Sequence, residues 1–336
     1  MKNATIARFL LQATLWGSSF TFIKASLHGL TPGQLVIARL LLGTAFLLSL
    51  AALRHVPLPR GAGLWGHVAA AALFGNVLPF LLLSYGERTT GAGLAGVLVG
   101  ATPLLTLGVA TAVLPAERAT ARKAVGLLVG FVGVVVVIGP WTDATGSFSG
   151  RAACFGAALS YAVGYVYVRK FLSPRALAPL AAAASQLLAA AVLMAAALPF
   201  LTWHTPHFTA KVTLSILFLG LFSTGLAYVL YFRLINDVGA TNASAVNYIV
   251  PVAAVLIGAV ALGEAVSWNL LVGGVIVLLG MGYAENRLGQ LRRTPEPAAP
   301  TPTPTPTPAD ESVPQAAAST ASTANPADKA NAQERR

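Results

Sequence analysis

Long apolar segments without a single Asp, Glu, Lys or Arg are the feature that most constrains this sequence. Examples are the segments Gly61 to Gly86, Thr89 to Ala116 and Ala265 to Ala284. Each is long enough to cross a bilayer as a helix, which takes about 20 residues. Over the whole chain 56% of residues are hydrophobic and 10% are charged, against roughly 25% charged in soluble domains. The sequence therefore excludes a soluble globular protein and predicts a chain embedded in lipid.

Ten apolar segments are found along the chain, and each predicts a transmembrane helix. The connections are short, as at Arg54 to Arg60, and leave no room for an extramembrane domain. Continuous apolar runs without strand-like alternation favour helices, because backbone groups in hydrocarbon must bond within their own segment. We therefore expect an all-α membrane protein with ten transmembrane helices, at about residues 6–27, 34–53, 64–85, 91–114, 123–140, 151–168, 177–200, 212–234, 239–262 and 267–285.

The net charge of +11 is explained by membrane topology. A nucleic-acid partner is not expected, because the basic residues are scattered between apolar segments and form no basic face. The connections on one side of the expected membrane carry most of the Lys and Arg, namely Lys2, Arg8, Arg54, Arg60, Arg118, Arg122, Lys123, Arg169, Lys170, Arg175, Arg233, Arg287, Arg292 and Arg293. The other side has Lys24, Arg88, Arg151 and Lys211. By the positive-inside rule, both termini are expected in the cytoplasm.

The two ends of the chain need separate interpretations. From Thr294 onward the sequence consists of Thr-Pro repeats and polar Ala/Ser/Thr residues, which cannot bury a core, so we expect a disordered tail over residues 289–336. At the other end, Lys2 and Arg8 precede an apolar run, as in a signal peptide. The nine later segments favour a retained first helix instead.

The second half of the chain repeats the first. The aligned pairs include Gly91 with Gly239, Ala92 with Ala240, Pro103 with Pro251, Glu117 with Glu264, Gly126 with Gly273, Gly133 with Gly280, Trp16 with Tyr161, Phe20 with Tyr165, and Lys24 with Arg169. We therefore divide the chain into five-helix repeats at residues 1–143 and 144–288. Five is odd, so the second repeat enters the bilayer from the opposite face, and inverted repeats around a central cavity are typical of secondary transporters.

These residues resemble a known family. The opening Leu15-Trp16-Gly17-Ser18-Ser19-Phe20, the Arg39 within the second segment, and the Glu117 and Glu264 boundaries before the fifth and tenth segments are similar to the EamA family of the drug/metabolite transporter superfamily. The resemblance covers residues 6–286. It implies a secondary carrier of the cytoplasmic (inner) membrane, often an exporter of amino acids or other small metabolites, with its path between the two halves.

Corresponding positions of the two repeats predict a solute cavity. Aromatic walls with a few hydrogen-bonding groups suit a small organic solute, although Trp and Tyr also anchor helices at membrane interfaces. With the resemblance, this predicts a path lined by the first, third, fourth, sixth, eighth and ninth segments. The candidate binding residues are Trp16, Ser19, Phe20, Asn76, Phe80, Tyr161, Tyr165, Tyr228, Asn247 and Tyr248.

Three further features have two interpretations each. Arg39 either bridges helices or snorkels, which we favour because of the cost of a charge in lipid, or it binds a substrate carboxylate. Pro251 is expected to kink the ninth segment and free the carbonyl of Asn247, and Pro103 is its counterpart. The small-residue faces formed by Gly126, Gly130, Gly133, Gly273 and Gly280 permit close packing within one chain or, with less weight, across a homodimer.

No catalytic, metal or cofactor motif is found. The chain lacks a phosphate-binding loop and a Cys/His cluster, and its single cysteine, Cys154, cannot form an intramolecular disulfide. The acidic residues of the apolar region, Glu87, Glu117, Asp237, Glu264 and Glu285, all fall at segment boundaries, so proton coupling would need these groups, and facilitated export is the alternative.

We expect a non-enzymatic secondary transporter that moves a small organic metabolite by alternating access. A membrane-embedded enzyme acting on lipid-linked substrates and a membrane scaffold acting through its tail are the two rival hypotheses.

Overall fold

The computed structural model describes residues 3–114, 120–139, 147–238 and 246–284, and every regular element in these ranges is a helix. The predicted tail, and the boundary residues Glu117 and Glu285, lie outside the described residues. The elements are α1 (Asn3–Ser26), α2 (Pro32–Leu53), α3 (Ala62–Ala72), η1 (Leu73–Val77), α4 (Leu78–Gly86), α5 (Ala92–Gly100), α6 (Thr102–Val113), α7 (Ala121–Ile138), α8 (Phe148–Tyr167), η2 (Val168–Leu172), η3 (Ser173–Arg175), α9 (Pro179–Ala197), η4 (Leu198–Phe200), α10 (Ala210–Leu217), η5 (Phe218–Leu226), α11 (Ala227–Val238), α13 (Val246–Leu262) and α14 (Trp268–Ala284).

Six helical segments are long and apolar enough to cross a membrane, namely Pro32–Leu53, Ala62–Gly86, Ala92–Val113, Ala121–Ile138, Pro179–Phe200 and Ala210–Tyr231. The apolar helices α13 and α14 are shorter. The prediction of a multi-pass, all-α membrane protein is thus confirmed, whereas the count of ten spans stays a prediction.

Short polar side chains begin several of these helices. Thr31 accepts a hydrogen bond from the backbone N–H of Gln34, and the Gln34 side chain accepts one from the backbone N–H of Thr31. Thr120, Ser147 and Thr209 cap α7, α8 and α10 in the same N-terminal position. Such caps satisfy the first free N–H groups of a helix, which is why the short connections suffice to end one helix and begin the next.

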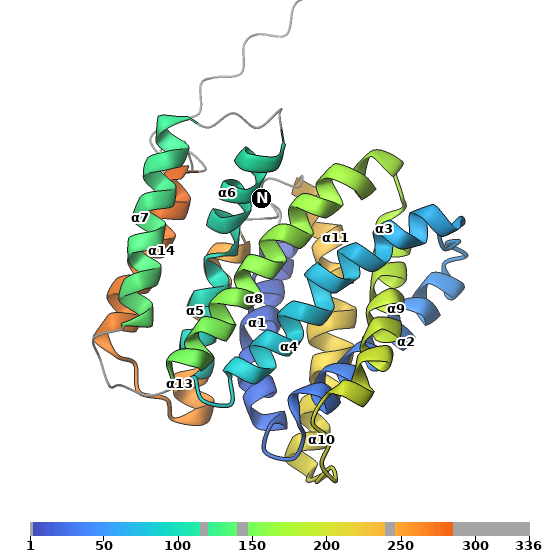
Figure 1. Cartoon of the computed structure of the whole chain (residues 1–336), viewed down its shortest axis with the longest axis horizontal. Coiled ribbons are helices and arrows are strands. Elements are labelled where there is room, and N and C mark those ends of the chain that lie inside the picture. Colours follow the sequence, from blue (N-terminus) through green and yellow to red (C-terminus); the bar gives the residue numbers. More distant parts are fainter. Residues whose placement is uncertain (1–2, 115–119, 140–146, 239–245, 285–336) are drawn as a thin grey trace, which may run out of the picture. The chain divides into compact units, whose positions relative to one another are not determined.

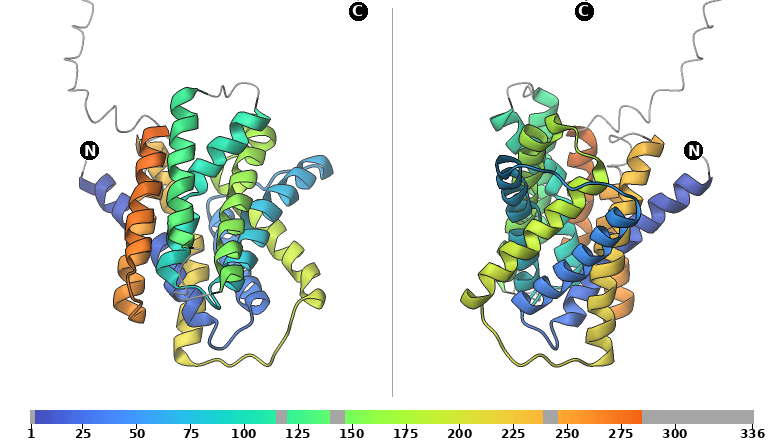
Figure 2. Two further views of the ribbon diagram at one scale, coloured as in Figure 1. Left: turned by 60° about the vertical axis from the view of Figure 1, so that its left-hand side comes forward. Right: turned by 90° about the vertical axis from the view of Figure 1, so that its right-hand side faces the viewer.

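Helix α1 lies among α5, α10, α11 and α13, and α8 lies against α4, α5 and α6 (Figure 1). Helices α7 and α14 stand side by side at one edge in this view, and they are neighbours again in the left view of Figure 2. The arrangement surrounds α1 and α8 with other helices and leaves the α7–α14 pair outside.

The glycine faces pack α7 against α14 within one chain. A methyl group at Gly126 would lie 2.7 Å from the carbonyl oxygen of Gly280, and one at Gly273 would lie 2.7 Å from the backbone nitrogen of Val137. Gly133 meets the backbone of Val277 in the same way. The contacts pair the start of α7 with the end of α14, so the two helices are antiparallel and touch through backbone atoms.

The two proline segments differ from each other. In the predicted fourth segment the helix is interrupted at Ala101, and Pro103 lies in the first turn of α6, where its missing N–H is tolerated. Pro251 instead lies inside the continuous helix α13. A methyl group at Gly100 would lie 2.4 Å from Pro251 Cγ, so the proline ring of α13 packs where α5 ends.

Candidate functional site

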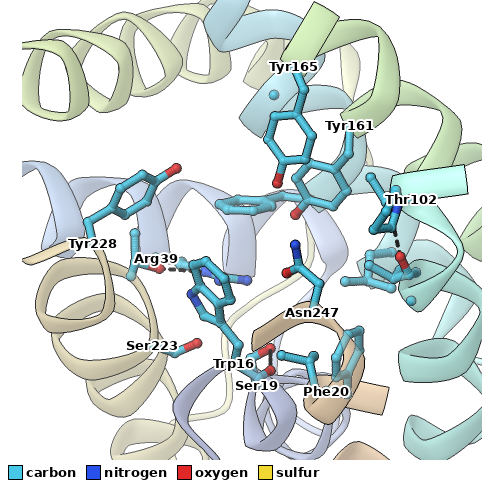
Figure 3. Close-up of a pocket in the computed structure, with 18 of the residues that line it drawn as sticks. Trp16, Ser19, Phe20, Arg39, Thr102, Tyr161, Tyr165, Ser223, Tyr228 and Asn247 are labelled. Carbon is cyan, nitrogen blue, oxygen red and sulfur yellow. Dashed lines mark hydrogen bonds between the residues drawn. The ribbon is translucent and has the colours of Figure 1, made fainter. Parts of the chain in front are cut away.

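A cavity of about 150 Å³ lies between the helices, with residues from both halves of the chain in its wall (Figure 3). This is smaller than the roughly 300–1,000 Å³ of pockets for drug-sized ligands, and it therefore suits a small solute. Its lining comprises Trp16, Ser19, Phe20, Arg39, Gly75, Phe80, Leu83, Val99, Gly100, Thr102, Pro103, Tyr161, Tyr165, Gln186, Ser223, Thr224, Tyr228, Asn247 and Val250.

Aromatic rings from four segments form much of this wall. The Phe80 and Tyr161 rings meet edge to face with centroids 6.5 Å apart, and Tyr161 stacks on Tyr165 at 6.1 Å. Trp16 contacts the ring of Tyr231 at 5.2 Å. Figure 3 shows Trp16 on one side of Asn247 and the hydroxyls of Tyr161 and Tyr165 on the other. The wall therefore offers aromatic faces to an apolar group, with hydroxyls between them.

Arg39 is buried in the cavity wall, only 7% exposed. Its Nε donates a hydrogen bond to the Thr224 hydroxyl at 2.9 Å, and its guanidinium lies 4.0 Å from the centroid of the Phe80 ring. This is its one hydrogen bond to the described residues, so the two terminal nitrogens are available to a ligand. The contact with Thr224 joins α2 to η5, so the residue bridges helices and faces the cavity at once.

The other polar groups of the wall are few. Ser19 donates to the carbonyl of Trp16 at 2.6 Å, within α1, and Thr102 of α6 donates to the carbonyl of Val99 in α5 at 2.6 Å. Gln186 donates through Nε2 to Asn76 Oδ1 at 2.8 Å. No carboxylate belongs to the lining. Within the described residues, the cavity wall thus carries one permanent charge, which is positive.

A second cavity, of about 430 Å³, continues the first toward the face where α1 begins and α14 ends. Both are lined by Trp16, Pro103, Tyr165, Tyr228 and Asn247, and the second also reaches Arg169 and the last residues of α14, Met281 and Ala284. The two cavities therefore form one space that widens toward this face.

At the opposite face the start of α5 is held by side chains of two other segments. Lys24 of α1 donates to the Thr90 carbonyl at 2.6 Å. The Glu264 carboxylate accepts hydrogen bonds from the backbone N–H groups of Ala92 and Gly93, at 2.7 and 3.0 Å. A carboxylate at a helix N-terminus is stabilised by the free N–H groups and by the helix dipole. These contacts tie together α1, α5 and the end of α13 on the side away from the second cavity.

Eight of the ten candidate binding residues line the cavity. Asn76 and Tyr248 do not: Asn76 is 1% exposed and accepts a hydrogen bond from Gln186 of the lining, and Tyr248 packs against the apolar core. Pro103 is in the lining and Pro251 is not, since it packs on Gly100. The predicted path omitted the second and seventh segments, which contribute Arg39 and Gln186.

Three π-helical stretches, η1, η2 and η5, were not predicted, and η1 and η5 reach the cavity wall. Element η1 interrupts the third segment and contributes Gly75 to the wall, and η5 interrupts the eighth and contributes Ser223 and Thr224. Such stretches are rare and occur frequently at functional sites. The apolar pattern of the sequence does not predict these stretches, because one extra residue in a turn leaves the composition of an apolar span unchanged.

Comparisons with known proteins place the chain among transporters. The model of the EamA-like transporter family matches residues 4–139 and, a second time, residues 148–283. An uncharacterized transporter of Bacillus subtilis, YdfC, is 27% identical, with 84% of this chain and 91% of that protein covered. A probable amino-acid metabolite efflux pump of Salmonella typhimurium is 26% identical over 81% of this chain and 91% of its own length. A solved crystal structure that shares 20% identity has the same fold, with a TM-score of 0.61 over 87% of this chain and 100% of that one.

The family model and the names of these relatives assign this helical, multi-pass membrane protein to the membrane transporters rather than to the enzymes. More particularly, the chain belongs to the EamA-like transporter family, as the family model matches most of its length.

Proposed function

We propose that this chain is a secondary carrier that exports a small organic solute bearing a carboxylate, an amino acid or a related compound, across the cytoplasmic membrane. The observation that carries this proposal is Arg39, whose terminal nitrogens face an aromatic cavity without a carboxylate in its lining. A planar guanidinium binds a carboxylate through two parallel hydrogen bonds. The name of the Salmonella relative, a probable amino-acid metabolite efflux pump, supports the solute class and the direction.

The carrier consists of two inverted repeats, residues 1–143 and 144–288. Three observations support this division. The family model matches twice in succession. The π-helical stretches η1 and η5 fall in corresponding spans, where Gly75 aligns with Ser223 and Phe80 with Tyr228. The last helices of the two repeats, α7 and α14, are antiparallel.

Transport proceeds by alternating access around the cavity. The widening of the cavity toward the face where α1 begins corresponds to an opening on the cytoplasmic side, if the Lys and Arg bias sets the orientation. The contacts of Lys24 and Glu264 with the start of α5 close the other side. The solute binds at Arg39 with its apolar part against Trp16 and Tyr165. Asn76 positions Gln186, and the break before Pro103 serves as the hinge.

The proposal is tested with the full chain in proteoliposomes loaded with an unlabelled amino acid. Entry of the same labelled amino acid by counterflow, tested one amino acid at a time, identifies the solute. A strain lacking the gene should accumulate that solute, and an overexpressing strain should lose it to the medium. Absence of counterflow for every amino acid and for simple carboxylic acids would contradict the proposal.

Deletion of residues 294–336 separates the carrier from a scaffold that acts through its tail. A carrier keeps its flux after the deletion, because both cavities described above are lined only by residues within 16–284. A loss of flux at normal membrane abundance would favour the scaffold.

A further inference from the structure

Glu87 is a buried carboxylic acid that does not line the cavity. It follows the span Ala62–Gly86 directly, its side chain is 1% exposed, and neither carboxylate oxygen has a hydrogen-bond partner among the described residues. An unpaired, buried carboxylate is among the most costly groups in a protein interior, whereas its protonated form is far less so. Burial raises the pKa of the Glu87 carboxyl well above its usual range, while nearby Lys24 lowers it and Glu264 raises it.

The charged neighbours of Glu87 are engaged elsewhere. From α1, Lys24 donates to the Thr90 carbonyl. From the segment after α13, Glu264 accepts from the start of α5. From α2, Arg39 is bonded to Thr224.

The titratable groups of α8 offer no counter-charge either. Cys154, packed on Gly86, is fully buried and free. Arg151 donates to the Ile138 carbonyl. In this arrangement Glu87 lacks an ion pair with any described residue, although a lysine lies on the neighbouring helix.

Whether Glu87 lacks an ion pair depends on the conformation of the carrier, because Lys24 bonds a carbonyl that can move away. Thr90 lies between Glu87 and the start of α5, so its carbonyl moves with α5. If α5 separates from α1 and α13 when this face opens, Lys24 loses its acceptor, and the same ammonium then has the Glu87 carboxylate as a new partner. An opposite charge at close range favours the ionised acid.

We propose that Glu87 is the proton-binding site of this carrier, protonated while Lys24 holds the Thr90 carbonyl and ionised when that face opens and Lys24 pairs with it. In the step, the O–H bond of the Glu87 carboxyl breaks, its proton passes to water at the opened face, and the Lys24 ammonium keeps its own protons and forms the ion pair. Closure reverses the step. The inference rests on the proposed alternating-access function, and it makes the opening of that face depend on pH.

Protonation is measured directly by infrared spectroscopy of the full chain in lipid over a pH series. The wild-type protein should show the carbonyl band of a protonated carboxylic acid at neutral pH, and Glu87→Gln, which has nearly the same shape, should lack it. Asp237→Asn, in a pair with Arg8 outside the site, should keep it. A band at neutral pH that Glu87→Gln does not remove, or no such band in the wild type, would overturn the proposal.

Opening is measured through Thr90→Cys in a Cys154→Ala background. Thr90 is fully buried here, and the substitution conserves its size and its carbonyl. The rate of labelling by a membrane-impermeant maleimide is divided by the rate for Thr205→Cys, which lies in an exposed connection. This ratio should rise with pH by up to about tenfold per pH unit below the pKa of Glu87, since each unit changes the ionised fraction tenfold. Adding Glu87→Gln should make the ratio independent of pH.

If the labelling ratio changed with pH in the same way with and without Glu87, opening of this face would not depend on ionisation of Glu87. Neither readout needs a transported solute. A failure of counterflow therefore speaks against the proposed function alone, and a missing carboxyl band speaks against Glu87 alone.

Discussion

The Nε atom of Arg39 and the hydroxyl of Thr224 are 2.9 Å apart and join α2 to η5 across the cavity wall. The Phe80 ring covers the guanidinium at 4.0 Å. Together the two contacts fix the plane of the guanidinium, so that a bound carboxylate meets it in one orientation. Substrate binding and the packing of two helices therefore depend on the same side chain.

Arg39→Gln should weaken binding of the transported amino acid by about 10- to 100-fold. Hydrogen bonds to charged groups contribute about 1.5–3 kcal/mol, and 1.4 kcal/mol corresponds to tenfold. Binding of the labelled amino acid and of its amide, which lacks the carboxylate, is compared in purified protein. The wild type should prefer the acid, and the variant should not. An equal loss for acid and amide would assign Arg39 to helix bridging only.

Trp16→Ala and Asn247→Ala should each lower solute flux about tenfold at normal membrane abundance. Both residues line the two cavities, so their loss removes contacts to the solute along its path. Trp203→Ala, at an exposed tryptophan in the connection after η4, is the matched control and should keep its flux. Unchanged flux in both cavity variants would contradict the assigned path.

Gly273→Ala should destabilise the protein by about 1–3 kcal/mol, the usual cost of overpacking a filled contact. Its methyl group would lie 2.7 Å from the Val137 nitrogen, whereas a methyl at the adjacent Gly274 would lie 3.5 Å from Val97 Cγ1. Gly274→Ala is therefore the control and should be neutral or slightly stabilising, because alanine favours helix.

Stability of the glycine variants is followed through Cys154, which is buried and free. A maleimide dye labels it only after unfolding, so the midpoint of labelling on heating reports stability. Equal midpoints for the two variants would show that the α7–α14 contact is looser than the structure has it.

Thr205→Cys should be labelled from outside intact cells, and Arg54→Cys only after the cells are permeabilised. Both residues lie in exposed connections, and they fall on opposite sides in the proposed ten-span topology. A tag at each terminus should also react only after permeabilisation. If both cysteines reacted from the same side, the inverted arrangement of the repeats would be wrong.

The sequence predicted the class of fold and much of the cavity wall, because the length of the apolar segments and the internal repeat can both be recognised from the order of the residues. Trp16, Tyr161 and Tyr228 were found by aligning the halves. Gln186 was missed, since one amide in an alanine-rich helix resembles a packing residue until its partner Asn76 is seen.

The boundary carboxylates show a different limit. The sequence places them at the ends of apolar segments and does not tell which of them are buried, whereas in the structure Glu87 is buried and Glu264 bonds the start of α5. Tertiary contacts at the membrane surface decide such burial, and no local pattern records them.

Because of the stretches η1 and η5, the shape of the site depends on the number of residues in these two helices as well as on their side chains. A π turn holds one residue more than the surrounding helix can. Deleting one residue from either stretch would restore a regular helix and leave the residues beyond it facing the same way, because the wide turn already absorbs the extra residue's rotation of about 100°. The wall residues within the stretches, Gly75 in η1 and Ser223 and Thr224 in η5, would be displaced instead. Single-residue deletions at these two stretches are thus a route by which a carrier of this design could reshape part of its cavity wall while Phe80 and Tyr228 keep their places.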